Sequence, residues 1–381
     1  MGETENDLML FGNRKPWLSL ISLMLIAFGG LIIGQFVAIL IVTKLYHLSV
    51  FQVMEMVTNI SEYPEYKVAI YIIQGISAVF AFILAPWVFL RFVEKKRFSV
   101  LNPNKEIELV PVTLALLISI VFMAVNFKFA EWNAQMVLPE FLKDVEAWMR
   151  LQEDKLEEAT YFLTTINNPL ELAMAMVVIA IIPAIGEELL FRGLIQNQLQ
   201  SWARNAHWAV WITAILFSAI HIQFYGFVPR MLLGALFGYM YLWSGNLLYP
   251  MLAHFANNGF QVVMLYLYSS ELTNFNIDNA DTVPWTVFFT SGLITVVLIL
   301  YYRHHFSKKP MEAAEWQKVF STDQLHRAEI VKSILNDHHM NAVLINKKDS
   351  SYHNFGDIEV HVTSDYTQRA LHIIENDVNF E

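Results

Sequence analysis

The chain has 381 residues, of which 55% are hydrophobic and 16% charged, so it is too apolar for a soluble globular protein. Its formal net charge of -10 gives no basis for nucleic-acid binding, because contacts to phosphates require a basic face that the sequence lacks. The absence of cysteine excludes disulfides, thiolate catalysis and cysteine-based zinc or iron–sulfur sites.

Apolar stretches long enough to cross a bilayer recur along the chain. A span needs about 20 apolar residues, and four windows of this kind occur at 17–43, 68–90, 110–127 and 285–302. The region 169–268 is apolar but interrupted by polar residues, and we divide it into spans at 170–199, 208–224, 230–245 and 247–268. The sequence therefore predicts an all-α polytopic membrane protein of about eight transmembrane helices, with the transmembrane domain at 1–309.

Basic residues flank the expected spans on one side, as they do in cytoplasmic loops. They are Arg14, Lys15, Arg91, Lys95, Lys96, Arg97, Lys105, Arg303, Lys308 and Lys309. An even number of crossings returns the chain to this side, so we expect both termini to be cytoplasmic. The acidic, amphipathic stretch 128–168 is then expected to form an outer loop with one or two interfacial helices.

After residue 310 the composition becomes that of a soluble domain. The hydrophobic patterns predict strands at 316–320, 342–345 and 358–362, and helices at 322–336 and 364–374. The sequence thus predicts a small cytoplasmic α+β domain at 310–381. This domain resembles a short domain of unknown function described as a signal-transducing module, which implies a regulatory or partner-binding role.

Two adjacent glutamates and an arginine interrupt the expected span 170–199. Ionisable side chains at membrane depth cost about 2.5 to 3.5 kcal/mol each, so their presence needs an explanation other than packing. On a helix, Glu188 and Arg192 share one face and can form an ion pair, whereas Glu187 is rotated by about 100° and remains free. Alternatively, both carboxylates lie at a polar helix end and reach headgroups or water. Pro183 and Gly186 upstream are expected to bend the helix.

Two histidines follow in the next apolar segments. A lone histidine near a helix end is more often a hydrogen-bonded or interfacial residue than a catalyst. Here, however, Phe217 precedes His221 by one turn and can shield it from solvent. His254 and Asn258 share a helix face at four-residue spacing, which suits a pair of donors aimed at one oxygen atom.

Three polar blocks therefore follow one another on successive expected membrane helices: EExxxR at 187–192, FxxxH at 217–221 and HxxxN at 254–258. In these blocks the chain resembles the CPBP family, also called Abi, which includes the CAAX prenyl endopeptidases and bacterial relatives linked to bacteriocin immunity. The resemblance covers about residues 170–270, and every motif position matches. It implies an intramembrane endopeptidase that hydrolyses a peptide bond at the inner (plasma) membrane of a bacterium.

The resemblance also implies a role for each motif residue. Glu187 is the expected general base that activates a water molecule, and His221 is expected to hold the same water or to share the proton. His254 and Asn258 are expected to stabilise the developing oxyanion. No nucleophilic side chain is needed in this mechanism, because the water attacks the peptide bond directly.

Glu188 and Arg192 are the implied structural supports of the site. A metal-dependent reading uses the same atoms, because Glu187, His221 and His254 supply a carboxylate and two imidazoles, an acceptable open set of zinc ligands. Family members are often named metalloproteases, although the helical zinc motif HExxH is absent from this chain. No cofactor is required in the glutamate mechanism, and zinc is the cofactor of the alternative.

The expected partners are membrane lipids and a protein or peptide substrate, including a lipidated one. A second class of function uses the same polar residues differently. In a transporter or a non-catalytic membrane scaffold they would line an ion path or hold helices together. Internal inverted repeats would favour a transporter, and none is found in the sequence.

Overall fold

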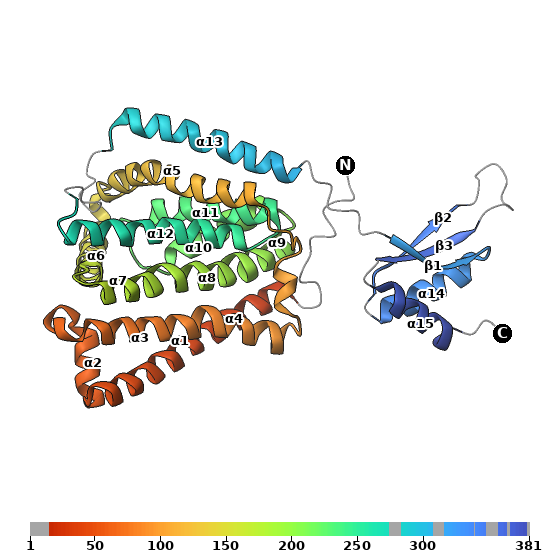
Figure 1. The fold of residues 1–381 in the computed structure, drawn as a ribbon, viewed down its shortest axis with the longest axis horizontal. Helices are drawn as coiled ribbons and strands as arrows, with labels where there is room; N and C mark the ends of the chain where they lie inside the picture. Colours follow the sequence, from red (N-terminus) through yellow and green to blue (C-terminus); the bar gives the residue numbers. More distant parts are fainter. Residues whose placement is uncertain are drawn as a thin grey trace. The chain divides into compact units, whose positions relative to one another are not determined.

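The computed structural model describes residues 15–273, 283–307, 316–338, 340–347, 357–363 and 366–378. The chain divides into two compact units, Met1–Phe306 and Ser307–Glu381. Arg14, Lys308, Lys309 and the start of the helix expected at 364–374 lie outside the described residues. The first unit is helical and the second contains a three-stranded sheet (Figure 1).

The α-helices of the membrane part run largely side by side, with α2 and α6 at one end (Figure 1). They are α1 (Pro16–Tyr46), α2 (Val50–Thr58), α3 (Lys67–Val79), α4 (Ala85–Val88), α5 (Leu109–Ala134), α6 (Lys143–Thr164), α7 (Pro169–Ala175), α8 (Ile182–Glu188), α9 (Asn197–Ala203), α10 (Ala206–Ala219), α11 (Phe227–Ser244), α12 (Leu248–Ser269) and α13 (Trp285–Ser307). Wider π-helical turns join several of them, namely η3 (Phe80–Leu84), η4 (Phe89–Val93), η7 (Met176–Ile181) and η8 (Leu189–Gln196). Short 3₁₀ turns are η1 (Ile60–Glu62), η2 (Pro64–Tyr66), η5 (Phe98–Leu101) and η6 (Glu140–Leu142).

All eight sequence ranges expected to cross the membrane are largely helical, and the chain is an all-α polytopic membrane protein with a small α+β part. In the described part of the chain, five helical stretches are long and apolar enough to cross a bilayer: Pro16–Tyr46, Pro64–Val93, Leu109–Ala134, Pro169–Ala203 and Trp285–Ser307. The total of eight crossings stays a prediction, because α10 has only 14 residues and a full span needs about 20.

The helix expected at 208–224 ends earlier than the sequence suggested. Helix α10 stops at Ala219, and His221 lies in the turn that follows. Side-chain contacts stabilise this end: the imidazole Nδ1 of His221 donates to the carbonyl of Phe217 at 2.8 Å, and the Ser218 hydroxyl donates to the carbonyl of Phe227 at 2.7 Å. Ile222 then takes φ 54°, a left-handed conformation that is uncommon for a β-branched residue and reverses the chain.

The helix that carries the two glutamates is continuous but contains two π-helical segments, on either side of α8. Gly186 in α8 lets it approach η3 closely, since a Cβ atom there would lie 2.6 Å from Cβ of Phe82. Pro183 removes one backbone donor from the same stretch. The bend expected at Pro183 and Gly186 stays a prediction, but π-helical turns, which recur at functional sites, flank this stretch.

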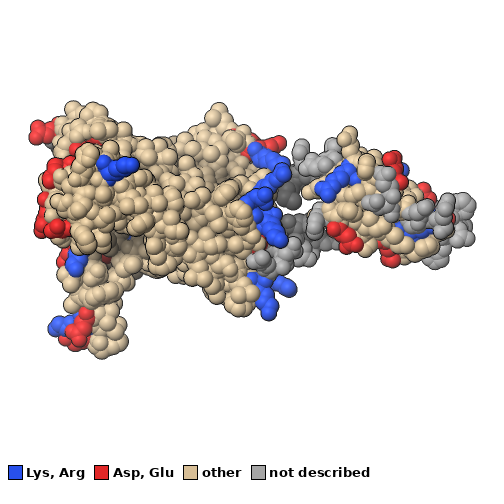
Figure 2. All heavy atoms as spheres, turned by 90° about the horizontal axis from the view of Figure 1, so that it is seen from below, with Lys and Arg blue, Asp and Glu red and all other residues tan. Residues whose placement is uncertain are grey.

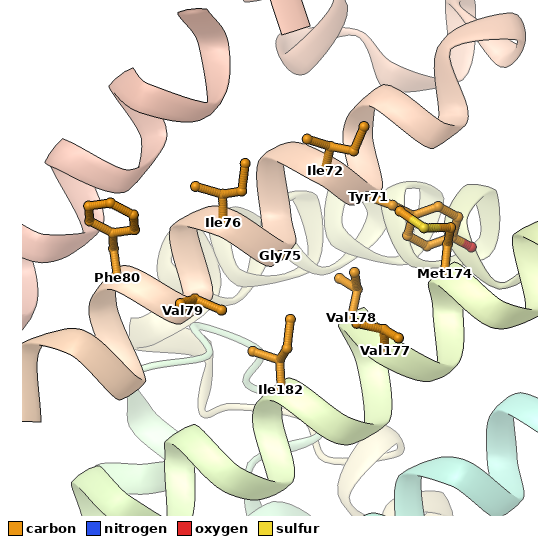
Figure 3. Close-up of a pocket in the computed structure, with 10 residues that line it drawn as sticks. All are labelled: Tyr71, Ile72, Gly75, Ile76, Val79, Phe80, Met174, Val177, Val178 and Ile182. Atoms are coloured by element: carbon orange, nitrogen blue, oxygen red, sulfur yellow. The ribbon is translucent and has the colours of Figure 1, made fainter. Parts of the chain in front are cut away.

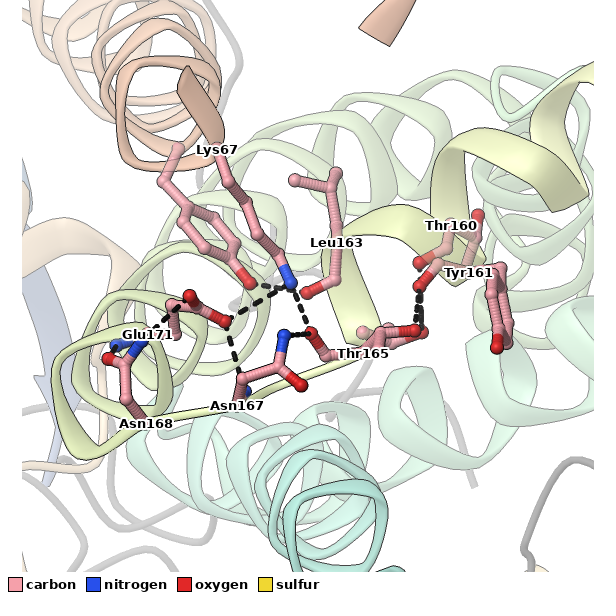
Figure 4. Close-up of polar contacts among 10 residues, drawn as sticks. Lys67, Thr160, Tyr161, Leu163, Thr165, Asn167, Asn168 and Glu171 are labelled. Atoms are coloured by element: carbon pink, nitrogen blue, oxygen red, sulfur yellow. Dashed lines mark hydrogen bonds and ion pairs between the residues drawn. The ribbon is translucent and has the colours of Figure 1, made fainter. Parts of the chain in front are cut away.

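A buried lysine joins α6 to the membrane helices (Figure 4). Lys67, at the start of α3, donates to the carbonyl of Thr165 and lies 3.3 Å from a carboxylate oxygen of Glu171. One turn along α3, the Tyr71 hydroxyl donates to the carbonyl of Leu163 at the end of α6. These bonds fix the C-terminal end of the amphipathic helix that the sequence predicts in the outer loop.

Charged side chains separate along the length of the membrane part (Figure 2). Acidic residues gather at the end where α2 and α6 lie, and Lys and Arg gather at the opposite end. This separation matches the asymmetry on which the sequence-based orientation depends.

The second unit is built from β1 (Trp316–Thr322), α14 (Leu325–Asp337), β2 (Ala342–Asn346), β3 (Ile358–Thr363) and α15 (Thr367–Asp377). Strand β3 is central, with β1 and β2 antiparallel on its two sides. Ile358, Val360 and Val362 alternate toward the core shared with the two helices, so Glu359 and His361 lie on the other face of the sheet. The α+β pattern predicted from the sequence is confirmed, whereas the signalling role stays a prediction.

Candidate active site

Glu188 and Arg192 form the buried ion pair that their four-residue spacing predicts. Nη1 of Arg192 lies 2.8 Å from Oε1 of Glu188, and both side chains are fully buried. Nη2 of Arg192 donates to the carbonyl of Gly234 at 2.9 Å. Glycine at position 234 allows α11 to pack closely on α10, because a Cβ atom there would lie 3.1 Å from Cα of Ala214. The pair thus ties η8 to α11 where α11 packs closely on α10.

His254 on α12 lies between the two glutamates. Its Nδ1 is 2.8 Å from Oε1 of Glu188, and its Nε2 is 3.9 Å from Oε2 of Glu187. Because an ionised carboxylate only accepts hydrogen bonds, Nδ1 carries the hydrogen and Nε2 points toward Glu187. The ring of Phe237 stacks on the imidazole at a centroid distance of 5.2 Å. Glu188 therefore holds Arg192 and orients His254 at the same time.

Glu187 and Glu188 differ in environment although they are adjacent. The Glu188 side chain is 0% exposed, and its Oε1 accepts from both Arg192 and His254, whereas the Glu187 side chain keeps 12% exposure. At 3.9 Å, Glu187 and His254 do not share a direct hydrogen bond, but a water molecule can bond to both atoms at once. The alternative in which both carboxylates lie at a polar helix end does not match this burial.

His221 reaches the cluster through Phe217. The Phe217 ring centroid lies 5.3 Å from the centroid of His221 and 6.2 Å from that of His254, so this ring contacts both imidazoles. The guanidinium of Arg192 lies over the same ring at 4.7 Å. His221 uses Nδ1 on the carbonyl of Phe217, which leaves Nε2 for another partner. In the described part of the chain, no direct hydrogen bond joins His221 to Glu187.

Asn258 lies one turn after His254 but has a different set of partners from the one expected. Its Nδ2 donates to the carbonyl of Ile179 at 2.9 Å, and its Oδ1 accepts from Asn257 at 3.0 Å. Ile179 is four residues before Pro183, which has no N–H to offer that carbonyl. Asn258 therefore supplies the donor that the proline cannot, and fixes α12 against η7. The expected pairing of Asn258 and His254 on one oxygen atom stays a prediction.

A second set of hydrogen bonds between η8 and α11 was not predicted from the sequence. Gln196 follows Arg192 by one turn and donates to the carbonyl of Gly238 at 3.1 Å, just as Arg192 donates to Gly234. Next to it, Asn197 donates to the Tyr241 hydroxyl at 3.0 Å. The sequence does contain a signal for these contacts. Arg192 and Gln196 are four residues apart, as are Gly234 and Gly238, so each pair lies on one helix face.

Arg230 was also missed. It lies in the first turns of α11, and its charge acts on the side chains of both Glu187 and His221. A single arginine inside an apolar span is a signal of a functional site that the sequence contains.

The described side chains do not form a metal site. Among the residues that the structure describes, no group of three or more His, Asp or Glu side chains is arranged to hold a metal ion. Nδ1 of His221 is bonded to a carbonyl and Nδ1 of His254 to Glu188, which leaves Nε2 of each imidazole for another partner. Zinc binding by Glu187, His221 and His254 stays a prediction.

An apolar cavity of about 300 Å³ lies between α3 and the helix that carries the glutamates (Figure 3). Ile72, Ile76 and Val79 on one side face Val178 and Ile182 on the other. The hydroxyl of Tyr71 at its rim is bonded to the carbonyl of Leu163. The cavity is lined by hydrocarbon and holds none of the polar site residues.

The fold and the buried cluster define an integral membrane protein with acid–base groups inside its helix bundle. Residues 169–260 match the family described as type II CAAX prenyl endopeptidase Rce1-like. The matched segment contains all seven motif residues.

One relative is an uncharacterized protein, YpbD, of Bacillus subtilis (strain 168). It is 32% identical over 84 residues, which cover 21% of this chain and 40% of YpbD. The similarity thus spans less than half of that relative's length. No solved structure matches the chain.

Proposed function

We propose that the membrane unit is an intramembrane endopeptidase in which Glu187 activates the water that hydrolyses a peptide bond. The observation that carries this proposal is the position of His254 between Glu187 and Glu188, 3.9 Å from one and 2.8 Å from the other. This contact lies within the segment that matches the Rce1-like family. The family description supplies the reaction class, and the geometry supplies candidates for the proton transfers.

In the proposed reaction, Glu187 accepts a proton from water while the water oxygen forms a bond to the carbonyl carbon of the substrate. The carbonyl oxygen becomes an oxyanion, and His254, which carries hydrogens on both ring nitrogens in this step, donates a hydrogen bond to it from Nε2. The bond from this carbon to nitrogen then breaks, and Glu187 passes its proton to the leaving amine. Glu187 thus returns to its starting state, and one water is consumed per peptide bond.

The other motif residues position these groups. Glu188 accepts the Nδ1 hydrogen of His254 and so sets the direction of Nε2, while Arg192 neutralises Glu188. His221 offers Nε2 to the same water from the turn after α10. Asn258 holds α12 on the carbonyl of Ile179, one turn from His254, so we assign it a positioning role.

The substrate class follows from the family description and the apolar surroundings. We propose a protein or peptide substrate that enters from the membrane, lipidated substrates included. The basic end of the membrane part favours cytoplasmic termini in a bacterial inner (plasma) membrane (Figure 2). For the second unit we propose a regulatory or partner-binding role.

Cleavage of peptides by the purified, lipid-reconstituted chain tests the proposal. Mass spectrometry should detect hydrolysis of an internal peptide bond by the wild type, and the Glu187→Gln variant should lose this activity by about 10²- to 10⁴-fold. Cleavage by Glu187→Gln at the wild-type rate would refute the role of Glu187. Ion flux in vesicles without any peptide cleavage would instead favour a transporter.

Metal content tests the choice of mechanism separately. Because Glu187, His221 and His254 do not form a ligand set in the described conformation, we expect less than about 0.1 zinc per chain in the purified wild type. Activity should also survive a chelator, and His221→Ala should have the same metal content. Stoichiometric zinc that disappears in His221→Ala would point to a zinc-bound water instead.

A further inference from the structure

Arg230 lies on the face of α11 that meets the candidate site. Gly234 and Phe237 follow it by four and seven residues, which places all three on one face of the helix. The carbonyl of Gly234 binds Arg192, and the ring of Phe237 stacks on His254. Arg230 lies in the first turn of α11 on this same face, and therefore at the edge of the site.

The contacts of Arg230 fix its guanidinium against the turn that carries His221. Its Nη2 donates to Oε1 of Gln223 at 2.7 Å, and its Nη1 to the carbonyl of Gln223 at 3.4 Å. Gly226 makes room for the group, because a Cβ at that position would lie 2.2 Å from Nη2. These contacts fix the position of the guanidinium beside Gln223, which follows His221 by two residues.

The charge of Arg230 is not matched by a close carboxylate. Among the described residues, no Asp or Glu oxygen lies within 4.0 Å of its nitrogens, whereas Arg192 has Glu188 at 2.8 Å. Glu187 and Glu153 act on Arg230 only through longer-range charge interactions. The guanidinium of Arg230 is partly buried, and a guanidinium binds planar carboxylates well because its parallel N–H groups donate to both oxygens.

We propose that Arg230 is a specificity-determining residue that binds a carboxylate of the substrate beside the bond to be cleaved. This inference rests on the proposed peptidase function. Two sources share this chemistry: the C-terminal carboxylate of a short leaving peptide, and the side chain of an Asp or Glu near the cleaved bond. The substrate carboxylate would be the ion-pair partner of Arg230, as Glu188 is the ion-pair partner of Arg192.

Matched peptides separate the two sources. One series differs only in a free or an amidated C-terminus, and the other only in Asp or Asn near the cleaved bond. With the full chain in lipid nanodiscs, the wild type should have about 10- to 100-fold higher kcat/KM for the charged member of one series. Arg230→Gln should remove this preference, and Arg230→Lys should retain part of it. Arg204→Gln, which changes an exposed arginine in the turn after α9, is the matched control and should keep the full preference.

Binding measurements keep the inference testable if a variant is inactive. Fluorescent versions of the same peptides are titrated onto the Glu187→Gln chain with and without Arg230→Gln, after thermal unfolding confirms that both are folded. Weaker binding of only the charged peptide in the double variant supports the proposal. Equal binding or cleavage of charged and neutral peptides by chains that retain Arg230 overturns it. Cleavage that does not depend on Glu187 would refute the proposed role of Glu187 but not that of Arg230. The preference for charged peptides would then be measured directly from their cleavage rates.

Discussion

Oε1 of Glu188 lies 2.8 Å from Nδ1 of His254, although 66 residues separate the two along the chain. The same oxygen accepts a hydrogen bond from Arg192, so one buried carboxylate joins three helices of the bundle. The structural effect is a fixed direction for the imidazole. The functional effect is that Nε2 faces Glu187, the carboxylate of the doublet that remains partly exposed.

The two adjacent glutamates should differ sharply in their effect on stability. Glu188→Gln leaves the buried guanidinium of Arg192 without its counter-charge, and we expect a loss of about 3–5 kcal/mol in the free energy of unfolding. Glu187→Gln has no ion pair within hydrogen-bond distance to lose and should change it by less than about 1 kcal/mol. Unfolding in detergent, followed by intrinsic fluorescence, measures both. Equal destabilisation by the two variants would show that the pair does not hold the bundle.

Close helix packing at Gly186 provides a second stability test. An Ala at this position would place its Cβ 2.6 Å from Cβ of Phe82, and such overpacking costs about 1–3 kcal/mol. Gly29 on α1 is the control, because a Cβ there meets no atom within 4 Å. Gly29→Ala should stabilise the helix by about 0.5–1 kcal/mol through its better helix propensity. Thermal unfolding of the two variants should therefore shift in opposite directions, and a neutral Gly186→Ala would contradict the packing described here.

Acid should weaken the second unit through Glu359. Hydrogen bonds from Lys347 and His361, with the charge of Lys347, lower the pKa of this carboxyl from 4.5 to about 2. A lowered folded-state pKa means that the stabilisation is complete above about pH 4.5 and is lost as the pH falls toward 2. Pepsin susceptibility of this unit in the full chain should thus rise more steeply below pH 4.5 in the wild type than in Glu359→Gln. Glu329→Gln, which removes an exposed carboxylate on α14, should follow the wild type.

Local spacing was enough to predict some of the site. The four-residue interval predicted the ion pair of Glu188 and Arg192, because side chains at that interval meet on any helix. The partner of His254 could not be predicted in this way. Its contact with Glu188 depends on how α12 packs against the glutamate helix, and periodicity carries no information about which helices become neighbours.

The missed features have separate physical causes. Helix α10 ends before His221 because a side chain and a left-handed residue, Ile222, stabilise the turn, and neither effect is visible in hydropathy. Asn258 bonds to Ile179 because Pro183 frees a carbonyl, which the sequence does contain as a signal. Arg230 was missed although its charge inside an apolar span was a visible signal. The eight helical ranges and the α+β tail were predictable because their hydrophobic patterns extend over many residues.

The central claim is that Glu187 and His254 act on one water at one peptide bond, and a double-mutant cycle of kcat/KM tests it most directly. Glu187→Gln and His254→Ala should each lower kcat/KM by about 10²- to 10⁴-fold. Because the two groups act together, the double variant should be no more than about tenfold slower than the slower single variant. Losses that multiply in the double variant would contradict the account, since the two side chains would then act independently.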